Sequence, residues 1–256
     1  MDGWRLAGSN AAGAVNYMLP GQTGESCRDI RQDTIFQKAF NAPLSVYEWM
    51  KQHPEHYGGL FKTLALCSNH DWVDAFPIVD EIGSFMSNDA ERVLLVDVGG
   101  GTGPQAAIFR QRLPHITGRV IVQDIPETLE HANAIDGIEF MEYDCFSPHP
   151  IRGAKFYYLR YVLHLWQDDK CVEALKSIIP AMGPESRILI DELVVPAPGA
   201  TWQMAWRSIG ITATLAGMER TRARWEGVLE AAELEILNIF PYDSNGQAII
   251  VAAPKN

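Results

Sequence analysis

Residues 93–103 read VLLVDVGGGTG, a short apolar run that leads directly into a glycine-rich turn. A run of this length bounded by glycines predicts a buried strand. Four runs of the same kind follow it, namely RVIVQD (119–124), IEFM (138–141), KFYYL (155–159) and RILIDE (187–192). Segments with helical spacing lie between them, at 105–113, 126–134 and 168–182. This alternation predicts a parallel sheet covered by helices on both faces.

The C-terminal part of the chain has a different pattern. EILNIF (235–240) and QAIIVA (247–252) flank the segment DSNG (243–246), in which Asn245-Gly246 supplies a hairpin turn. We therefore predict an α/β, Rossmann-like sheet of seven strands, five of them parallel and two in a C-terminal β-hairpin.

The region before the sheet divides into two parts. Residues 1–32 are rich in Gly, Ala and Asn and predict an irregular arm or a short helix. Residues 33–90 carry apolar residues at helical spacing around 36–50, 61–67 and 73–79, so we expect a short helical segment that covers a ligand pocket from one side. Residues 91–256 then form the ligand-binding sheet domain.

Composition excludes several classes of function. The net charge of −11 and the pI near 5.1 argue against nucleic acid and anionic membranes as partners, because both require a basic surface. No apolar run approaches the length of a membrane span. Cys27, Cys67, Cys145 and Cys171 lie far apart, which predicts neither a disulfide framework nor a zinc site and indicates a reducing, cytoplasmic compartment. No metal site is expected.

The glycine turn narrows the choice of ligand. Gly99, Gly101 and Gly103 form G-x-G-x-G, whereas the dinucleotide fingerprint G-x-G-x-x-G requires a glycine where this chain has Pro104. The Gly-Lys-Ser/Thr of a phosphate-binding loop is also absent, so the ligand need not carry a pyrophosphate. Asp97, just before the turn, can either hold the turn or receive an ammonium group.

Carboxylates also end the next two strands. Asp124 lies 25 positions after Gly99, where a carboxylate can accept both hydrogens of a ribose diol. Asp144 follows the third strand beside Cys145 and Phe146, a set that suits an adenine ring and its amine. Three such features on three consecutive strands favour S-adenosylmethionine over a dinucleotide.

The motifs VDVGGGTG, VQDIP, YDCF, YLRYVLHLW and GMERT (217–221) resemble those of the plant-type and fungal small-molecule O-methyltransferases, a class I S-adenosylmethionine-dependent family. The resemblance runs from about residue 36 to residue 252. It implies S-adenosylmethionine as cofactor and S-adenosylhomocysteine as product, with cofactor contacts from Gly99, Asp124, Asp144, Cys145 and Arg160.

One of the seven histidines follows a strand at the edge where the cofactor is expected. His164 comes after the fourth strand, Glu192 ends the fifth, and Glu219 precedes the last long helix. A carboxylate bonded to one imidazole nitrogen fixes the tautomer and leaves the other nitrogen able to take a proton. The resemblance gives His164 the role of general base and the two glutamates the role of orienting acids.

The chain departs from the family pattern in two respects. Leu165 stands where the family commonly has Asp or Asn, which places efficient proton removal in question. The resemblance also implies an N-terminal helical domain, and we expect most of it to be absent from the residues before the glycine turn. That domain builds a dimer in the family, so we expect a homodimer to be weakened here.

The sequence thus predicts methylation of a hydroxyl on a small aromatic or polyketide secondary metabolite. The acceptor is poorly specified: the stretch 201–218, with Trp202, Met204 and Trp206, is as consistent with plain core as with a pocket wall. Two alternatives remain, a pericyclase that keeps the fold and the cofactor, and a truncated relative without catalytic activity.

Overall fold

The computed structural model describes residues 34–53, 56, 72–85 and 90–255. The expected N-terminal arm and the helix expected around residues 61–67 lie outside the described residues. Within them, no helix is long and apolar enough to cross a membrane.

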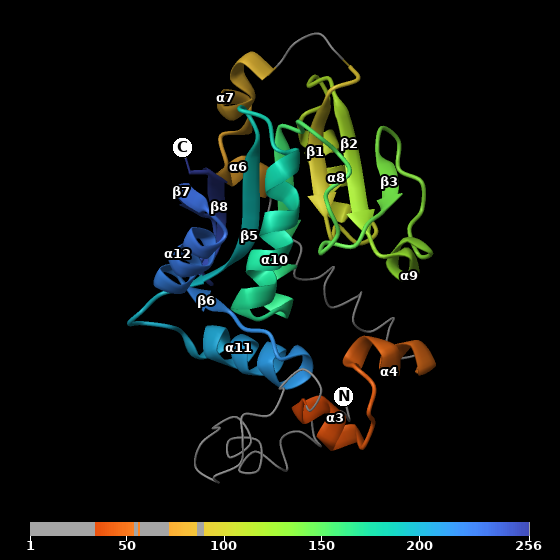
Figure 1. The fold of residues 1–256 in the computed structure, drawn as a ribbon, viewed down its shortest axis with the longest axis vertical. Helices are drawn as coiled ribbons and strands as arrows, with labels where there is room; N and C mark the ends of the chain where they lie inside the picture. The colour runs from red at the N-terminus through yellow and green to blue at the C-terminus, as the bar shows by residue number, and fades with distance from the viewer. Residues whose placement is uncertain (1–33, 54–55, 57–71, 86–89, 256) are drawn as a thin grey trace.

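One sheet forms the centre of the molecule, with the strand order β3-β2-β1-β4-β5-β8-β7 (Figure 1). The first five pair in parallel, and β8 and β7 pair antiparallel at one end. Their bounds are β1 Val93–Val98, β2 Arg119–Asp124, β3 Glu139–Glu142, β4 Phe156–Arg160, β5 Arg187–Val195, β7 Leu234–Pro241 and β8 Gln247–Pro254. The predicted seven-stranded fold is confirmed. The two-residue β6 (Arg220–Thr221), which was not predicted, pairs with the end of β5.

Two hydrophobic cores lie on opposite faces of this sheet. On one face, β1 contributes Val96 and Val98 to a core shared with α10 (Asp168–Ile178) and α12 (Arg222–Ala231). On the other face, Leu95 packs with residues of α6 (Trp72–Ala75), α7 (Ile78–Ile82) and α8 (Pro104–Arg112). The alternation of side chains along β1 therefore serves both cores, as expected for a doubly covered strand.

Two predicted helices have different bounds in the structure. The helix expected over 126–134 is a single turn, α9 (Pro126–Leu129). Beyond it, backbone hydrogen bonds join residues only three positions apart, as from Ala132 N to Leu129 O. The helix expected around 73–79 is two helices, α6 and α7, separated at Pro77. Proline lacks an N–H and disfavours a helical residue before it, which explains the break.

The aromatic side chains of this segment belong to the core of the sheet. Trp72 stacks on Tyr158 of β4 with ring centroids 4.3 Å apart, and Phe76 meets Phe156 edge-on at 5.7 Å. α6 and α7 therefore pack directly against the sheet.

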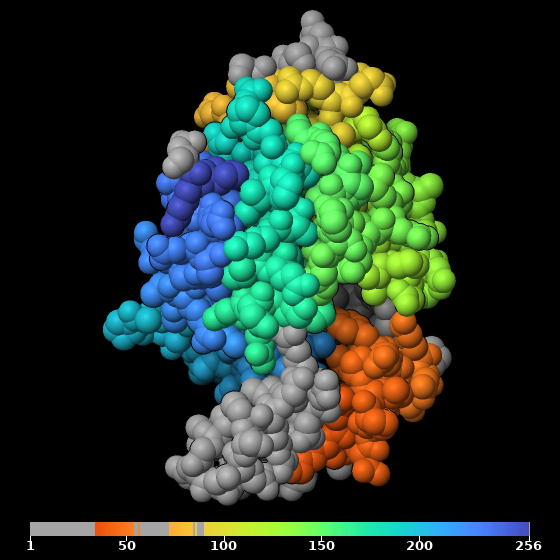
Figure 2. All heavy atoms as spheres, viewed as in Figure 1, coloured from red at the N-terminus to blue at the C-terminus, as the bar shows by residue number. Residues whose placement is uncertain are grey.

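Three other helices lie at the carboxyl end of the parallel strands (Figure 1). They are α3 (Ile35–Phe40), α4 (Val46–Gln52) and α11 (Trp202–Leu215). α3 contacts α11, and Lys51 of α4 pairs with Glu127 of α9 at 2.9 Å. Figure 2 shows the segment of α3 and α4 set against the end of the sheet. The lid expected from residues 33–90 thus remains a prediction for α3 and α4.

Candidate active site

The glycine turn between β1 and α8 depends on backbone conformations and close approaches that side chains would prevent. Gly99, Gly101 and Gly103 all have positive φ, at +72°, +63° and +85°. A Cβ on Gly99 would lie 2.5 Å from Cγ2 of Val162. A Cβ on Gly100 would also lie 2.5 Å from the carboxyl carbon of Asp97. The turn is therefore folded tightly around the end of β1, and glycine is required there for steric reasons.

Asp124 joins this turn to the next strand. Its Oδ2 accepts a hydrogen bond from Gly101 N at 2.8 Å, and its Oδ1 accepts one from Ile125 N at 2.8 Å. Each oxygen keeps a second lone pair, so the carboxylate can still accept bonds from a ligand.

Asp144 lies after the adjacent strand, β3, and is exposed. Its Oδ1 accepts a hydrogen bond from Phe146 N at 3.1 Å, which fixes the following turn. Cys145 and Phe146 are half-buried, and the Phe146 ring meets Trp166 edge-on at 4.9 Å. The structure thus brings an exposed carboxylate and an apolar pair together at one edge.

Asp97 and Arg160 are buried groups of opposite charge, each with an unpaired atom. Burial, together with the charge of Asp124, raises the pKa of Asp97 to about 7. Asp97 Oδ2 and Arg160 Nη2 find no hydrogen-bond partner among the described residues. The same holds for both polar side-chain atoms of Gln105, at the start of α8, a residue that the sequence analysis did not select. Orphaned buried polar atoms of this kind call for a ligand.

The guanidinium of Arg160 is oriented by Asp191 of β5. The carboxylate of Asp191 is fully buried and accepts four hydrogen bonds from side chains. The donors are Arg160 Nη1 at 2.7 Å, Tyr158 Oη at 2.5 Å, Tyr242 Oη at 2.6 Å and Gln247 Nε2 at 2.7 Å. Four donors thus satisfy one buried carboxylate. The sequence analysis missed this network because its members come from β4, β5 and the two sides of the C-terminal hairpin.

His164, Glu192 and Glu219 meet at the carboxyl edge of the sheet. Nδ1 of His164 lies 3.1 Å from Glu219 Oε1 and 3.6 Å from Glu192 Oε2. Glu192 Oε1 also accepts the backbone N–H of His164 at 3.2 Å. Among the described residues, no hydrogen bond is made at Nε2 of His164. The tautomer that protonates Nδ1 therefore leaves Nε2 as the acceptor.

The GMERT motif shapes the backbone around this histidine. A Cβ on Gly217 would lie 2.0 Å from the carbonyl oxygen of His164, and the same oxygen accepts the N–H of Met218 at 2.9 Å. Fully buried Arg220 donates to the carbonyls of Leu163 at 3.0 Å and Trp166 at 2.6 Å. The loop that carries Glu219 is therefore bonded directly to the loop that carries His164.

A family model described as an O-methyltransferase domain matches residues 22–234. The chain belongs to this S-adenosylmethionine-dependent O-methyltransferase family. O-methyltransferase okaF of Penicillium ochrochloron is 59% identical, over 98% of this chain and 70% of that protein. Demethylsterigmatocystin 6-O-methyltransferase of Aspergillus flavus is 49% identical, over 98% of this chain and 68% of that protein.

Solved structures extend the comparison to the fold. A structure described as a pericyclic reaction enzyme gives a TM-score of 0.86 at 33% identity, and that of LepI in complex with SAM gives 0.85 at 32%. Each match covers 98% of this chain and 64% of the other. The chain thus spans about two thirds of these relatives.

The pKa values of the two glutamates in this O-methyltransferase chain are shifted in opposite directions. Burial raises the pKa of Glu192 to about 7, and the neighbouring Glu219 adds to the effect. Burial opposes ionisation of Glu219 too, but the hydrogen bonds and charges of His164 and Arg207 outweigh it and lower its pKa. The pKa of His164 is raised, because the two glutamates overcome the effect of burial. His164 and Glu192 therefore compete for one proton near neutral pH.

The same three residues also have the spacing of a metal site, which the sequence did not predict. One ligand atom from each of His164, Glu192 and Glu219 lies within 4.8 Å of the others. Arg207 of α11, however, already places a cation there, since its Nε lies 2.7 Å from Glu219 Oε1. The sequence analysis did not select Arg207, although it is the sole charged residue in 201–218.

The apolar stripe of α11 is divided in the structure. Met204 is buried, whereas Trp202 and Trp206 are 74% and 61% exposed. These two tryptophans therefore belong neither to the core nor to a closed pocket wall in the chain as described.

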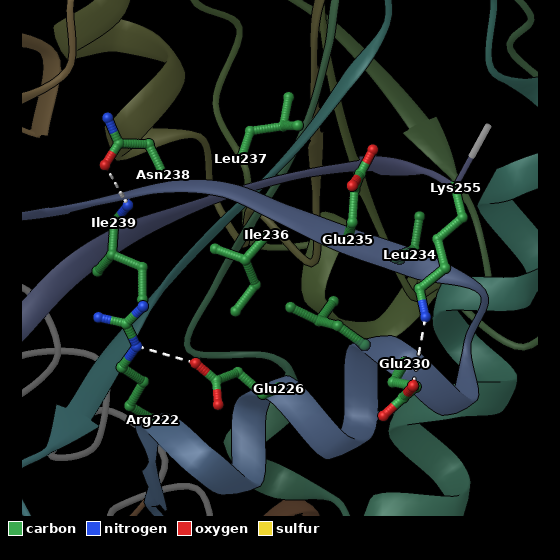
Figure 3. Close-up of a pocket in the computed structure, with 11 residues that line it drawn as sticks. Arg222, Glu226, Glu230, Leu234, Glu235, Ile236, Leu237, Asn238, Ile239 and Lys255 are labelled. Atoms are coloured by element: carbon green, nitrogen blue, oxygen red, sulfur yellow. Dashed lines mark hydrogen bonds and ion pairs between the residues drawn. The ribbon is translucent and has the colours of Figure 1, made fainter.

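A groove of about 410 Å³ lies elsewhere, between α12 and β7 (Figure 3). Arg222 pairs there with Glu226, and Lys255 with Glu230. None of the predicted site residues lines it, so we do not assign it to the methyltransferase reaction.

Proposed function

We propose that this protein transfers a methyl group from S-adenosylmethionine to a hydroxyl of a small aromatic or polyketide secondary metabolite. His164 removes the hydroxyl proton, and Glu219 and Glu192 orient the imidazole of His164. The contact of 3.1 Å between His164 Nδ1 and Glu219 Oε1 carries the proposal. It supports a base whose tautomer is fixed and whose Nε2 accepts the proton.

The unpaired buried atoms fit the cofactor. Asp97 Oδ2 suits the ammonium of its methionine moiety and Arg160 Nη2 the carboxylate, each group meeting the opposite charge. The free lone pairs of Asp124 suit the ribose diol, and the glycine turn lets the backbone approach the ligand closely. Asp144, Cys145 and Phe146 would hold the adenine. When bound, S-adenosylmethionine supplies an electrophilic methyl group on its sulfonium.

The side chains of the protein must remove the proton of the acceptor hydroxyl. A phenolic hydroxyl with a pKa of about 10 is a poor nucleophile at neutral pH. A positioned general base typically accelerates such a step by about 10²–10⁴-fold. Glu219, bonded to Nδ1, stabilises the imidazolium that forms when Nε2 of His164 takes the proton.

The test is a His164→Gln variant assayed for S-adenosylhomocysteine formation. The acceptors are simple phenols and demethylsterigmatocystin, the acceptor in the name of one relative. We expect kcat to fall by about 10²–10⁴-fold, while the calorimetric Kd for S-adenosylmethionine changes little. A His164→Gln variant as active as the wild type would remove this residue from the mechanism.

Asp124→Ala is the matched variant for comparison with His164→Gln, because it alters the proposed cofactor site and leaves the proposed base intact. It should weaken cofactor binding and leave the rate at saturating cofactor much less affected. An unchanged Kd would refute the ribose role of Asp124.

A pericyclic reaction is the second candidate. The similarity to a pericyclic reaction enzyme favours it, whereas the bonded His164–Glu219 pair favours methyl transfer. Conversion of an acceptor in the presence of S-adenosylmethionine without any S-adenosylhomocysteine would support the pericyclase. Failure to bind S-adenosylmethionine would contradict both and leave a non-catalytic relative.

A further inference from the structure

Arg207 reaches the proposed catalytic centre from α11, a helix outside the sheet. Its Nε lies 2.7 Å from Glu219 Oε1, the same oxygen that faces His164 Nδ1 at 3.1 Å. The Glu219 side chain is fully buried, while that of Arg207 remains 33% exposed. One carboxylate oxygen thus bridges a guanidinium at the protein surface and a buried imidazole.

Among the described residues, Glu192 forms no comparable ion pair with an arginine. Glu192 accepts the backbone N–H of His164 through Oε1, and its Oε2 makes no hydrogen bond among the described residues. Two buried carboxylates beside one imidazole cannot both ionise without a large penalty. The guanidinium therefore stabilises the charge of one member of the pair and not equally that of the other.

Tyr161 holds the guanidinium in place. The guanidinium carbon of Arg207 lies 4.6 Å from the centre of the Tyr161 ring, and that ring stacks on His164 at 5.5 Å and 19°. Tyr161 has a positive φ of 55°, and its hydroxyl donates to Gln247 Oε1 at 3.1 Å. A non-glycine residue in this conformation is a strained feature that clusters at functional sites. Its position here fixes Arg207 and His164 on one aromatic ring.

We infer that Arg207 is a positioning residue for the proposed base: it keeps Glu219 a carboxylate bonded to Nδ1 and leaves Glu192 as the acid that shares a proton with His164. The inference rests on the proposed function only for its effect on rate. Its effect on protonation is independent of any acceptor.

The direction of that effect follows from the charges around His164. They are Glu192 from β5, Glu219 before β6, Arg207 from α11, and Tyr161 on its own loop. The guanidinium carbon of Arg160 also lies 4.8 Å from the centre of the Tyr161 ring. The charge of Arg207 opposes the rise in the pKa of His164 that the two glutamates cause. Removing this charge stabilises the protonated forms of the imidazole and of both glutamates, so the midpoint for His164 should move to higher pH.

The primary measurement is NMR titration of histidine-labelled protein, with the His164 resonance identified from the His164→Gln variant. Arg207→Gln should raise its midpoint, whereas Arg207→Lys, which retains the charge, should restore most of the wild-type value. Arg207→Met provides a second neutral side chain, so a single misfolded variant does not decide the outcome. An unchanged or lower midpoint in both neutral variants would overturn the inference.

The second measurement is the pH profile of kcat for the wild type and the Arg207 variants. A midpoint raised by one unit would reduce kcat about tenfold on the acid side and leave it unchanged at high pH. Arg222→Gln removes a surface cation of α12 (Figure 3) and should change neither readout. A wild type without methyl transfer but with the expected NMR shift would refute the proposed function and leave the role of Arg207 standing. Loss of kcat by an equal factor at every pH would contradict that role.

Discussion

At the scale of single residues, the site consists of common side chains whose surroundings make them unequal. Glu192 and Glu219 are chemically identical, yet the pKa of one is raised to about 7 and that of the other is lowered. Burial acts on both, and the difference comes from the donors around Glu219. When the surroundings shift the pKa values of two neighbouring carboxyl groups in opposite directions, the shifts indicate which group acts as acid and which as base.

Glu192→Gln tests this assignment at the residue scale. Loss of the Glu192 charge removes the strongest influence that raises the pKa of His164, so the midpoint of the kcat profile should move to lower pH. This shift is opposite in sign to the one expected for Arg207→Gln. The two pH profiles, measured with the same acceptor, check it, and shifts in the same direction would contradict the assignment.

At the scale of elements, the loop before α12 matters because it fixes two other segments. Arg220 is fully buried and ties the carbonyls of Leu163 and Trp166 to Asp168 at the start of α10. Thr221 follows at once and caps α12 through Arg224 N. One short motif thus sets the backbone path of the proposed base and the start of a helix.

Arg220→Met should therefore destabilise the protein, because it removes the charged donor that the carbonyls of Leu163 and Trp166 share with Asp168. We expect the free energy of unfolding to fall by about 1–3 kcal/mol, the usual range when a buried, charge-assisted hydrogen-bond donor is removed. Urea denaturation at neutral pH measures it. The exposed Arg222→Met is the control and should cost less than about 0.5 kcal/mol. Equal stability of the two variants would show that Arg220 does not clamp these loops.

At the scale of the whole molecule, the glycine turn places a buried carboxyl group where the cofactor is proposed to bind. The folded-state pKa of Asp97, about 7, lies above its ordinary value of 3.8, so folding favours its protonated form. Its contribution to stability is complete below pH of about 3.8 and is lost as pH rises through about 7.

Asp97→Asn should remove this dependence. Relative to wild type without cofactor, the variant should gain stability as pH rises from 5 to 8, because the buried charge no longer forms. Urea denaturation at several pH values tests this, with exposed Asp80→Asn as the control. A stability difference that stays constant with pH would contradict the burial of an unpaired Asp97 charge.

Most of the fold follows from local patterns in the sequence. The apolar runs predicted the bounds of β1 and β2 to the residue, and Asn245-Gly246 predicted the position of the hairpin turn. Both succeed because strand periodicity and turn geometry depend on neighbouring residues. The division at Pro77 was missed even though the proline is visible, since helical spacing continues across it. Other shifts at strand ends follow from pairing with neighbouring strands, as in β5, which extends to Val195 where it meets β6.

The sequence by itself determined which residue types were available for the chemistry: a glycine turn, carboxylates at the ends of several strands and one well-placed histidine. The tertiary structure alone decided how they meet. His164 lies 28 positions from Glu192 and 55 from Glu219, and they come together because β4 pairs with β5 and the GMERT loop folds back onto His164. Arg207 could be noticed as a lone charge in an apolar stretch, but its partner could not be read from spacing. Which side chain shares a buried proton depends on distances of a few ångströms between distant segments, and these distances exist only once the sheet has formed.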